Sequence, residues 1–277
     1  MSRSRTYVVA TLGAVLFGGC LDESPFQPLN HSVVVHAVLD VDSRNQYIIV
    51  QQVDGASGTQ TQVTGATVAI SGPDGRALLA REVTDTLAFQ SSYHQVKVNR
   101  VYRLSLDEYG VTLVEGQQYS LRVTTAAGEV VTGTTIIPVN PVPAPPAGVL
   151  DTIDPTRDSI LVSWTPGKYA KAYDLTISYT GAFFIVPTLI YRTFVDSSFF
   201  LSPRSSTLSS YVLQNNFLND IIVLGVDANY YDYYRRGTSL LGASGVVNHL
   251  TGGVGVFGSV GRVSRQRVWA RYPGTPR

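Results

Sequence analysis

Hydrophobic and polar residues alternate in short runs along most of the chain after residue 31. Residues 33–41 and 47–53 are rich in β-branched residues and are separated by a polar Asp-Ser-Arg-Asn segment. Such runs, bounded by turn residues, are typical of β-strands. Residues 66–71 and 76–81 flank Gly-Pro-Asp-Gly, which favours a tight turn, so we predict that they pair as a hairpin. The pattern predicts an all-β protein.

One glycine-containing segment indicates the kind of β fold. The sequence LVEGQQY at 113–119 resembles the tyrosine corner of Greek-key sandwiches, in which a bend lets the phenol of Tyr119 bond to upstream backbone. Residues 130–137 then read as a closing strand before a proline. We predict an immunoglobulin-like β-sandwich over residues 31–139.

A second sandwich is predicted after a proline-rich segment. Residues 140–150 contain too many prolines for a central strand or a helix and are expected to form an extended linker. Beyond it, alternating hydrophobic residues at 160–164 and 173–177 resemble the B and C strands of a fibronectin type III domain, with Trp164 in the core. We therefore expect a fibronectin type III-like β-sandwich over residues 151–272, in tandem with the first.

Two parts of this second region are read less simply. Residues 221–234 are expected to form a central strand that runs out into a tyrosine-rich end. Residues 181–216 contain apolar runs broken by prolines and serines, and both regular strands and a short helix or loop insertion fit them.

The first twenty residues do not belong to the β pattern. Arg3 and Arg5 precede an uncharged apolar run that is too short to span a bilayer comfortably, and the run ends at Cys20, the only cysteine of the chain. These parts are typical of an export signal. The sequence Leu-Phe-Gly-Gly-Cys also resembles the lipobox of bacterial lipoproteins, although Phe17 stands where an aliphatic residue is usual.

We therefore predict a signal peptide over residues 1–19, palmitate or a similar lipid on Cys20, and a lipidated tether over residues 20–30. The alternatives are an ordinary signal peptide and a buried apolar strand. Asp22 and Glu23 resemble a signal for display on the outer face of the outer membrane, but a solvated tether explains them somewhat better. The expected localisation is the outer membrane, with its periplasmic or cell-surface face left open.

Charge excludes one class of partner. The formal net charge is +1, and no run of lysine or arginine occurs. Such a chain has no long-range field to attract nucleic acid, so no nucleic-acid partner is expected. With its one cysteine assigned to lipid, the chain would contain no disulfide, so burial and sheet hydrogen bonds must stabilise it.

Several motifs occur together in a characteristic order. They are VVVHAVLD at 33–40, G-A-T-V before P-D-G, G-x-x-Y-x-L-x-V-x-T leading to T-x-I-I-P, and GG-x-G-x-F-G-S at 252–259. This order resembles the uncharacterised exported lipoproteins of the family called domain of unknown function 4249, often encoded beside TonB-dependent receptors in Gram-negative bacteria. The resemblance implies an accessory, binding or assembly role at the outer membrane, and it brings no catalytic residues.

No catalytic or metal-binding set is recognised in the sequence. The glycines at 252–258 lack the Lys-Ser or Lys-Thr of a phosphate-binding loop, and close backbone approach near a last strand explains them better, with Phe257 covering the bottom of a sandwich. His31 and His36 lie on opposite faces of an extended chain, and no G-x-S-x-G is present. We expect no enzyme, no cofactor and no metal.

The best candidate for a binding site is an aromatic and basic cluster. It consists of Tyr230, Tyr231, Tyr233, Tyr234, Arg235 and Arg236. Tyrosine and arginine are enriched at binding hot spots, and a strand end with its loop is a common place for function. The structural alternative is that these tyrosines flank a strand, with half of them in the core.

Three functions follow from these observations. The first is a non-enzymatic outer-membrane lipoprotein that acts as an accessory or assembly partner of a TonB-dependent receptor. The second is a surface lipoprotein that binds a glycan or peptide directly through the cluster. The third is an unrecognised hydrolase.

Overall fold

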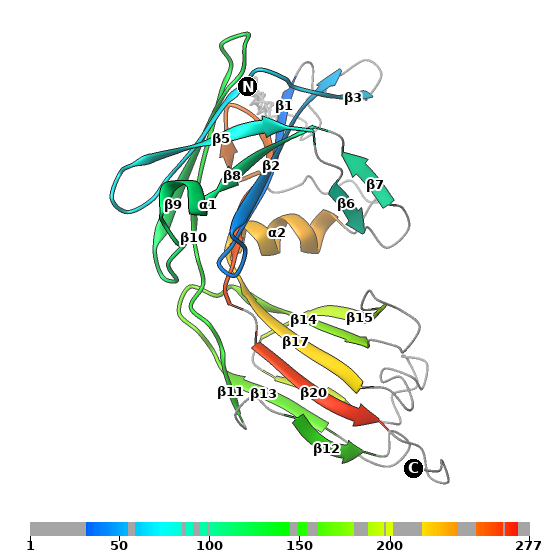
Figure 1. Cartoon of the computed structure of the whole chain (residues 1–277). Helices are drawn as coiled ribbons and strands as arrows, with labels where there is room; N and C mark the ends of the chain where they lie inside the picture. Colours follow the sequence, from blue (N-terminus) through cyan, green and yellow to red (C-terminus); the bar gives the residue numbers. More distant parts are fainter. Residues whose placement is uncertain are drawn as a thin grey trace, which may run out of the picture.

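The computed structural model describes residues 32–54, 59–84, 87–90, 95–98, 100–144, 149–153, 160–179, 188–196, 198–201, 218–237, 248–262 and 264–270. Within them the chain is mostly β, which confirms the predicted class. The strands form two lobes, upper and lower in Figure 1, and a helix lies between them. In this part of the chain, no helix is long and apolar enough to cross a membrane. The predicted signal peptide, tether and Cys20 lie outside the described residues.

The first lobe is one continuous path of strands that folds back on itself. Its order is β19-β1-β2-β8-β5-β4-β9-β10-β18, with β3 added beside β2. The bounds are β1 (Ser32–Asp40), β2 (Asn45–Asp54), β3 (Thr59–Gln62), β4 (Thr67–Ser71), β5 (Ala77–Val83), β8 (Val101–Ser105), β9 (Gln118–Thr124), β10 (Val130–Ile136), β18 (Leu250–Thr251) and β19 (Val254–Val260). A separate hairpin is formed by β6 (Leu87–Gln90) and β7 (Gln95–Val98), and a short helix, α1 (Leu106–Tyr109), follows β8.

Local sequence explains these strands. Alternate residues of β1 are buried, so the period-two pattern places one face of the strand in the core. The predicted hairpin is confirmed, because Val68 of β4 lies opposite Ala80 of β5. The predicted tyrosine corner is also confirmed, since Val114 donates its backbone N–H to Oη of Tyr119 at 2.9 Å. Gly116 makes the bend with a φ of 78°, which glycine adopts without strain.

The second lobe packs two groups of strands. One follows the order β12-β20-β17-β14-β15, and the other β11-β13-β16. The bounds are β11 (Val142–Ala144), β12 (Val149–Ile153), β13 (Ile160–Thr165), β14 (Ala172–Tyr179), β15 (Thr188–Val195), β16 (Ser198–Leu201), β17 (Leu218–Val226) and β20 (Ser264–Ala270). Trp164 lies in the core between them, as predicted, and its ring is edge-on to Tyr173. Parts of the unassigned region 181–216 form β15 and β16.

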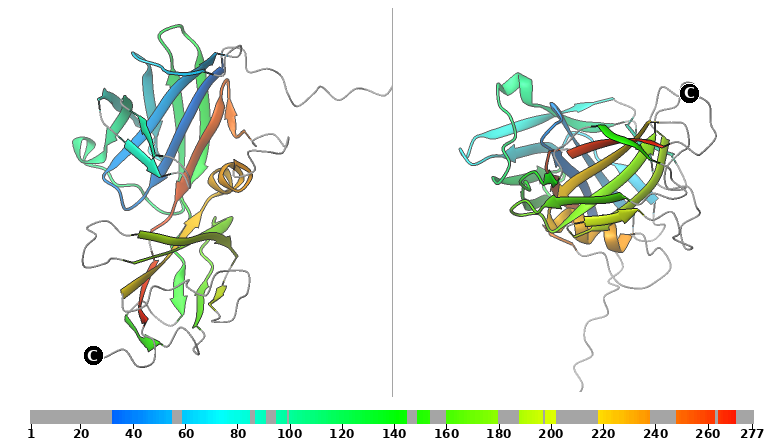
Figure 2. Two further views of the ribbon diagram at one scale, coloured as in Figure 1. Left: turned by 90° about the vertical axis from the view of Figure 1, so that its right-hand side faces the viewer. Right: turned by 90° about the horizontal axis from the view of Figure 1, so that it is seen from below.

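The tandem division predicts that the chain completes one lobe before it enters the other. The structure shows a different path. After β17 the chain leaves the second lobe, forms β18 and β19 in the first, and returns as β20 (Figures 1 and 2). β19 pairs in parallel with β1, and Phe257 is fully buried in the core of the first lobe. Residues 250–260, which the sequence placed in the second sandwich, therefore complete the first.

Glycines allow this return. Gly255 has a φ of 122°, and a Cβ there would lie 2.0 Å from the carbonyl oxygen of Val35. A Cβ on Gly133 would lie 2.6 Å from the side chain of Leu250. The predicted close backbone approach is confirmed, but it serves the first lobe, because β1 of that lobe has an open edge on which β19 can pair.

The proline-rich segment is partly built into the second lobe. Val142–Ala144 pairs with β13, and Val149–Ile153 pairs in parallel with β20. β11 lies at an edge of its sheet, which is where strands tolerate proline. The expected extended linker over 140–150 therefore contains strand residues at 142–144 and 149–150, and residues 145–148 lie outside the described part.

Candidate functional site

The tyrosine-rich segment forms a helix and not the end of a strand. β17 ends at Val226, and α2 (Ala228–Gly237) follows after one residue. That residue, Asp227, accepts a 2.9 Å hydrogen bond at Oδ1 from the backbone N–H of Tyr230, and the N–H of Tyr231 begins the helical ladder on the carbonyl of Asp227. Aspartate in this position stabilises a helix N-terminus. The prediction of a strand through residue 234 was wrong because this cap starts a helix first.

The helix brings the predicted tyrosines together but uses most of them for packing. Tyr230 is only 8% exposed and donates a 3.2 Å hydrogen bond from its phenol to Oδ2 of the buried Asp174. Its ring lies 4.4 Å from that of Tyr234, one helical turn later, and edge-on to Phe194. Tyr230 therefore joins a small core with Val226 and Val260, between the lobes.

Tyr234 and Tyr233 pack against the first lobe. Oη of Tyr234 lies 2.6 Å from Nε2 of His36 on β1, and the ring of Tyr233 lies edge-on to the same imidazole. Burial beneath α2 lowers the pKa of His36 to about 4, so the ring is neutral at physiological pH. Burial also raises the pKa of Tyr233. These contacts fix the helix on β1.

The remaining members of the cluster are less buried. Tyr231 is half-buried and packs edge-on to Phe194, and Arg235 is exposed. The guanidinium of Arg235 lies 5.2 Å from the ring centre of Tyr231 and hydrogen-bonds to its phenol. The side chain of Arg236 lies outside the described part. The cluster therefore offers a much smaller free surface than its composition suggests.

Asp227 connects three segments that are distant in the sequence. Its Oδ2 accepts a 2.6 Å hydrogen bond from Oγ1 of Thr135 on β10, and its Oδ1 accepts a 3.1 Å bond from the backbone N–H of Ser259 on β19. Thr135 Oγ1 also lies 2.8 Å from Oγ of Ser259, which donates to the carbonyl of Ile136. Burial raises the pKa of Asp227, and the hydrogen bonds that it accepts oppose this rise.

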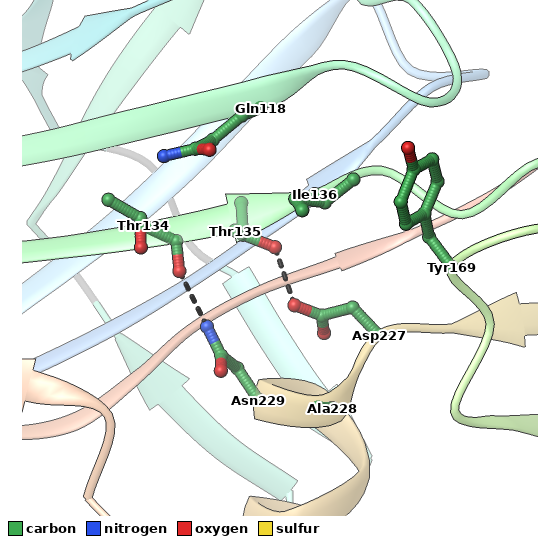
Figure 3. Close-up of a pocket in the computed structure, with 8 residues that line it drawn as sticks. All are labelled: Gln118, Thr134, Thr135, Ile136, Tyr169, Asp227, Ala228 and Asn229. Carbon is green, nitrogen blue, oxygen red and sulfur yellow. Dashed lines mark hydrogen bonds between the residues drawn. The ribbon is translucent and has the colours of Figure 1, made fainter.

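A hollow of about 270 Å³ opens beside Asp227, at the start of α2 (Figure 3). It lies between the end of β10, Gln118 of β9 and Tyr169, which comes from the turn before β14. Asn229 is held there, because its Nδ2 donates to the carbonyls of Thr134 and Phe257 at 2.7 and 2.8 Å. The hollow is thus lined by polar groups, by Ile136 and Ala228, and by one exposed aromatic ring.

A second hollow of about 360 Å³ lies on the outer face of the same strands. Its lining includes Ser120 and Arg122 of β9, Thr132 and Thr134 of β10, and His249. Nε2 of His249 lies 3.1 Å from Oδ2 of Asp232, on the solvent-facing side of α2. Thr134 lines both hollows.

Sequence reasoning missed these groups. Asp227 could have been found, because an aspartate directly before a segment with tyrosines at 230 and 234 fits a capped amphipathic helix. Gln118, Arg122 and Thr134 come from strands whose outward faces look like ordinary solvated surface. Nothing in the sequence indicates that the turn at Tyr169 lies in one hollow with Gln118 and Thr134.

The arrangement offers polar groups and one aromatic ring to a ligand. Within the described ranges, no group of three histidine, cysteine, aspartate or glutamate side chains could hold a metal ion. In the same ranges, the hydrogen-bond partner of the His249 ring is Asp232, and no serine or threonine hydroxyl completes a triad with them. The site can donate and accept hydrogen bonds and offer one aromatic ring.

Comparison with known proteins identifies a family but no function. A family model described as "Domain of unknown function (DUF4249)" matches residues 23–266. No curated protein matches the chain. Among solved structures, "Crystal structure of chicken CNTN1 FN1-FN3 domains" is similar over 87% of this chain and 66% of that chain, at 9% identity and a TM-score of 0.24. A score this low supports no conclusion about either lobe.

Proposed function

The chain belongs to the DUF4249 family, and from this we propose that it is a non-enzymatic lipoprotein of the outer membrane and an accessory partner of a TonB-dependent receptor. In this proposal, lipid on Cys20 holds the protein at the membrane, and the two lobes together form the surface that meets the receptor. The motif order of the chain resembles that of exported lipoproteins often encoded beside such receptors, and this resemblance supports the partnership.

One structural observation supports a scaffold role. Asp227 hydrogen-bonds to β10 and β19, while α2, which begins at the next residue, packs on β1. Because these contacts join both lobes through buried groups, the body is expected to move as one unit. A rigid body suits a protein that positions a partner, whereas an enzyme would need convergent catalytic groups.

The finer fold assignment belongs to the same proposal. We assign the first lobe to immunoglobulin-like sandwiches on its tyrosine corner, and the second to fibronectin type III-like sandwiches on Trp164 between its two groups of strands. An experimental structure of either lobe that aligns poorly with such domains would count against the assignment.

Co-purification tests the function. The full-length lipoprotein, extracted with mild detergent from its own cells, is expected to recover a TonB-dependent receptor in stoichiometric amounts. The Cys20→Ala variant serves as the matched control for anchoring and is expected to leave the membrane after an alkaline wash. Repeated recovery of no outer-membrane protein would reject the receptor partnership, and a Cys20→Ala variant that stays with membranes would reject the lipid anchor.

A further inference from the structure

We propose that the two hollows beside β9 and β10 form one trough that binds a short glycan. The trough is defined by Gln118, Arg122, Thr134, Tyr169, Asn229 and His249. This proposal does not require a receptor partner, and it places the binding site on the outer face of β9 and β10 and at the start of α2, not on the aromatic and basic cluster of residues 230–236.

The strand register makes the trough continuous. Ser71 of β4, Ser120 of β9 and Thr134 of β10 lie directly opposite one another across three neighbouring strands. Two residues further along β9 and two residues earlier on β10, Arg122 and Thr132 lie opposite each other on the same outward face of the sheet. Since Thr134 lines both hollows, a ligand longer than one ring can extend from Tyr169 toward His249.

The chemistry of the lining matches a ligand rich in hydroxyl groups. Amides, hydroxyls and a guanidinium supply both donors and acceptors at short spacing, as a row of sugar hydroxyls requires. Asn229 is already oriented by its two hydrogen bonds to backbone carbonyls, so binding costs little further ordering of this side chain. An extended peptide would instead need apolar side-chain pockets or an open strand edge. β9 is paired on both sides, and β10 is paired with β9 along its length and with β18 at Thr132 and Gly133. Beyond this point the carbonyls of Thr134 and Ile136 accept hydrogen bonds from Asn229 and Ser259.

Tyr169 supplies the aromatic surface. It is 43% exposed, and within the described part of the chain it is the one residue other than glycine with a positive φ, at 68°. Backbone strain of this kind persists only where the surrounding structure holds the residue in place, and it is frequent at ligand-binding sites. Nζ of Lys168 lies 4.6 Å from the ring centre of Tyr169. A tyrosine ring can stack on the apolar face of a sugar while its hydroxyl stays hydrated.

Charge narrows the glycan class. Asp227 is hydrogen-bonded within its buried network, and Asp232 faces His249, so the carboxylates near the trough already have partners. Among the described residues that line the two hollows, Arg122 is the one lysine or arginine, and Lys168 lies beside Tyr169 at the edge. One guanidinium can bind a single carboxylate or a pair of hydroxyls, but it does not make a site for a polyphosphate. We therefore expect neutral glycans or glycans with isolated uronic acids.

Binding assays on the full-length lipoprotein in detergent test the proposal. Probes are maltohexaose, xylohexaose, mannohexaose and hexagalacturonate, followed by an array of oligosaccharides and an array of extended peptides. At least one oligosaccharide is expected to bind. Tyr169→Gly and Arg122→Ala should each weaken that binding about tenfold or more, as expected for residues at the centre of a site. Tyr169→Gly removes the ring and also the strain at positive φ, so it should fold.

Two matched variants serve as controls. Tyr231→Ala removes a half-buried aromatic ring of α2 that packs edge-on to Phe194 outside the trough, and Arg44→Ala removes an exposed arginine elsewhere on the first lobe. Both should bind the glycan as the wild type does. The proposal is overturned if no oligosaccharide binds, if peptides alone bind, or if Tyr231→Ala weakens binding while Tyr169→Gly does not. Loss of glycan binding with unchanged receptor recovery separates this proposal from the receptor partnership.

Discussion

Thr135 donates a 2.6 Å hydrogen bond from Oγ1 to Oδ2 of Asp227, across 92 residues of sequence. The bond ties the closing strand of the first lobe to the residue where the chain leaves the second lobe and begins α2. Ser259 of β19 bonds to both residues. A single carboxyl group therefore holds the point at which the lobes and the helix meet.

Replacing Asp227 should destabilise the whole protein. In Asp227→Ala, the hydroxyl of Thr135 and the N–H groups of Tyr230 and Ser259 lose a buried acceptor, and the helix loses its cap. We expect the free energy of unfolding to fall by about 2–4 kcal/mol. Urea denaturation followed by circular dichroism measures this change. Asp107→Ala, at an exposed carboxyl in the first lobe, is the control and should change stability by less than about 0.5 kcal/mol. Equal losses would mean that the Asp227 network contributes nothing specific.

His36 should make stability depend on pH. Its pKa falls to about 4 on folding from its ordinary value of 6.5, so the unfolded chain binds a proton that the folded chain does not. Stability from this residue is therefore intact above pH 6.5 and is lost as pH falls toward 4. Between pH 7.5 and pH 5, the wild type should lose about 2 kcal/mol more than His36→Gln.

The comparison with His36→Gln also removes a competing effect. The raised pKa of Asp227 acts in the opposite direction, because the folded chain keeps a proton that the unfolded chain releases, and stability is lost as pH rises through that window. Asp227 is present in both proteins, so its contribution cancels. Urea denaturation of both proteins at pH 7.5 and pH 5 measures the difference. If the wild type and His36→Gln lose equal stability between these pH values, His36 does not titrate as described.

Two phenol hydroxyls on α2 should differ in importance. Tyr230→Phe removes the buried hydrogen bond to Asp174, so we expect a loss of about 1–2 kcal/mol in unfolding free energy. Tyr231→Phe removes a hydroxyl that contacts Arg235 near solvent and should cost less than about 0.5 kcal/mol. Thermal denaturation of the two variants, side by side, checks the order. If Tyr231→Phe lost more stability than Tyr230→Phe, the buried hydrogen bond of Tyr230 would not be stabilising, and Tyr230 would again be a candidate binding residue.

Two glycines with positive φ should also differ. Both Gly255 and Gly128 adopt angles that disfavour alanine, but a Cβ on Gly255 would lie 2.0 Å from the carbonyl oxygen of Val35, whereas Gly128 has open space. Gly128→Ala should cost about 1 kcal/mol from strain alone. Gly255→Ala must in addition push β19 away from β1, so we expect more than about 3 kcal/mol or failure to fold. Similar stabilities would contradict the close parallel pairing.

The first lobe should not fold from its contiguous sequence. A fragment of residues 31–139 lacks β18 and β19, and with them Leu250 and Phe257 of its core. We expect this fragment to show no cooperative thermal transition by circular dichroism, because an open strand edge and a cavity replace the closing strand. The same fragment joined by a flexible linker to residues 248–262 is the matched control and should regain the transition. A cooperative transition in the fragment alone would support the tandem division.

Local patterns in the sequence determined much of this protein. Alternating residues specified β1 and its buried face, Gly-Pro-Asp-Gly specified the hairpin of β4 and β5, and the bend before Tyr119 specified the tyrosine corner. These features depend on side-chain period and turn conformation, which act over a few residues. The position of Trp164 in a core follows for the same reason.

The tertiary structure alone decided which strands meet and where the candidate site lies. The side-chain pattern of residues 254–260 is compatible with a closing strand in either lobe. Only the open edge of β1 determines that these residues pair in the first lobe. The tyrosines of α2 read as a binding surface until His36, Asp174 and Phe194 cover them. Gln118, Thr134 and Tyr169 come together because the chain turns back beside β10, a long-range contact that no local pattern encodes.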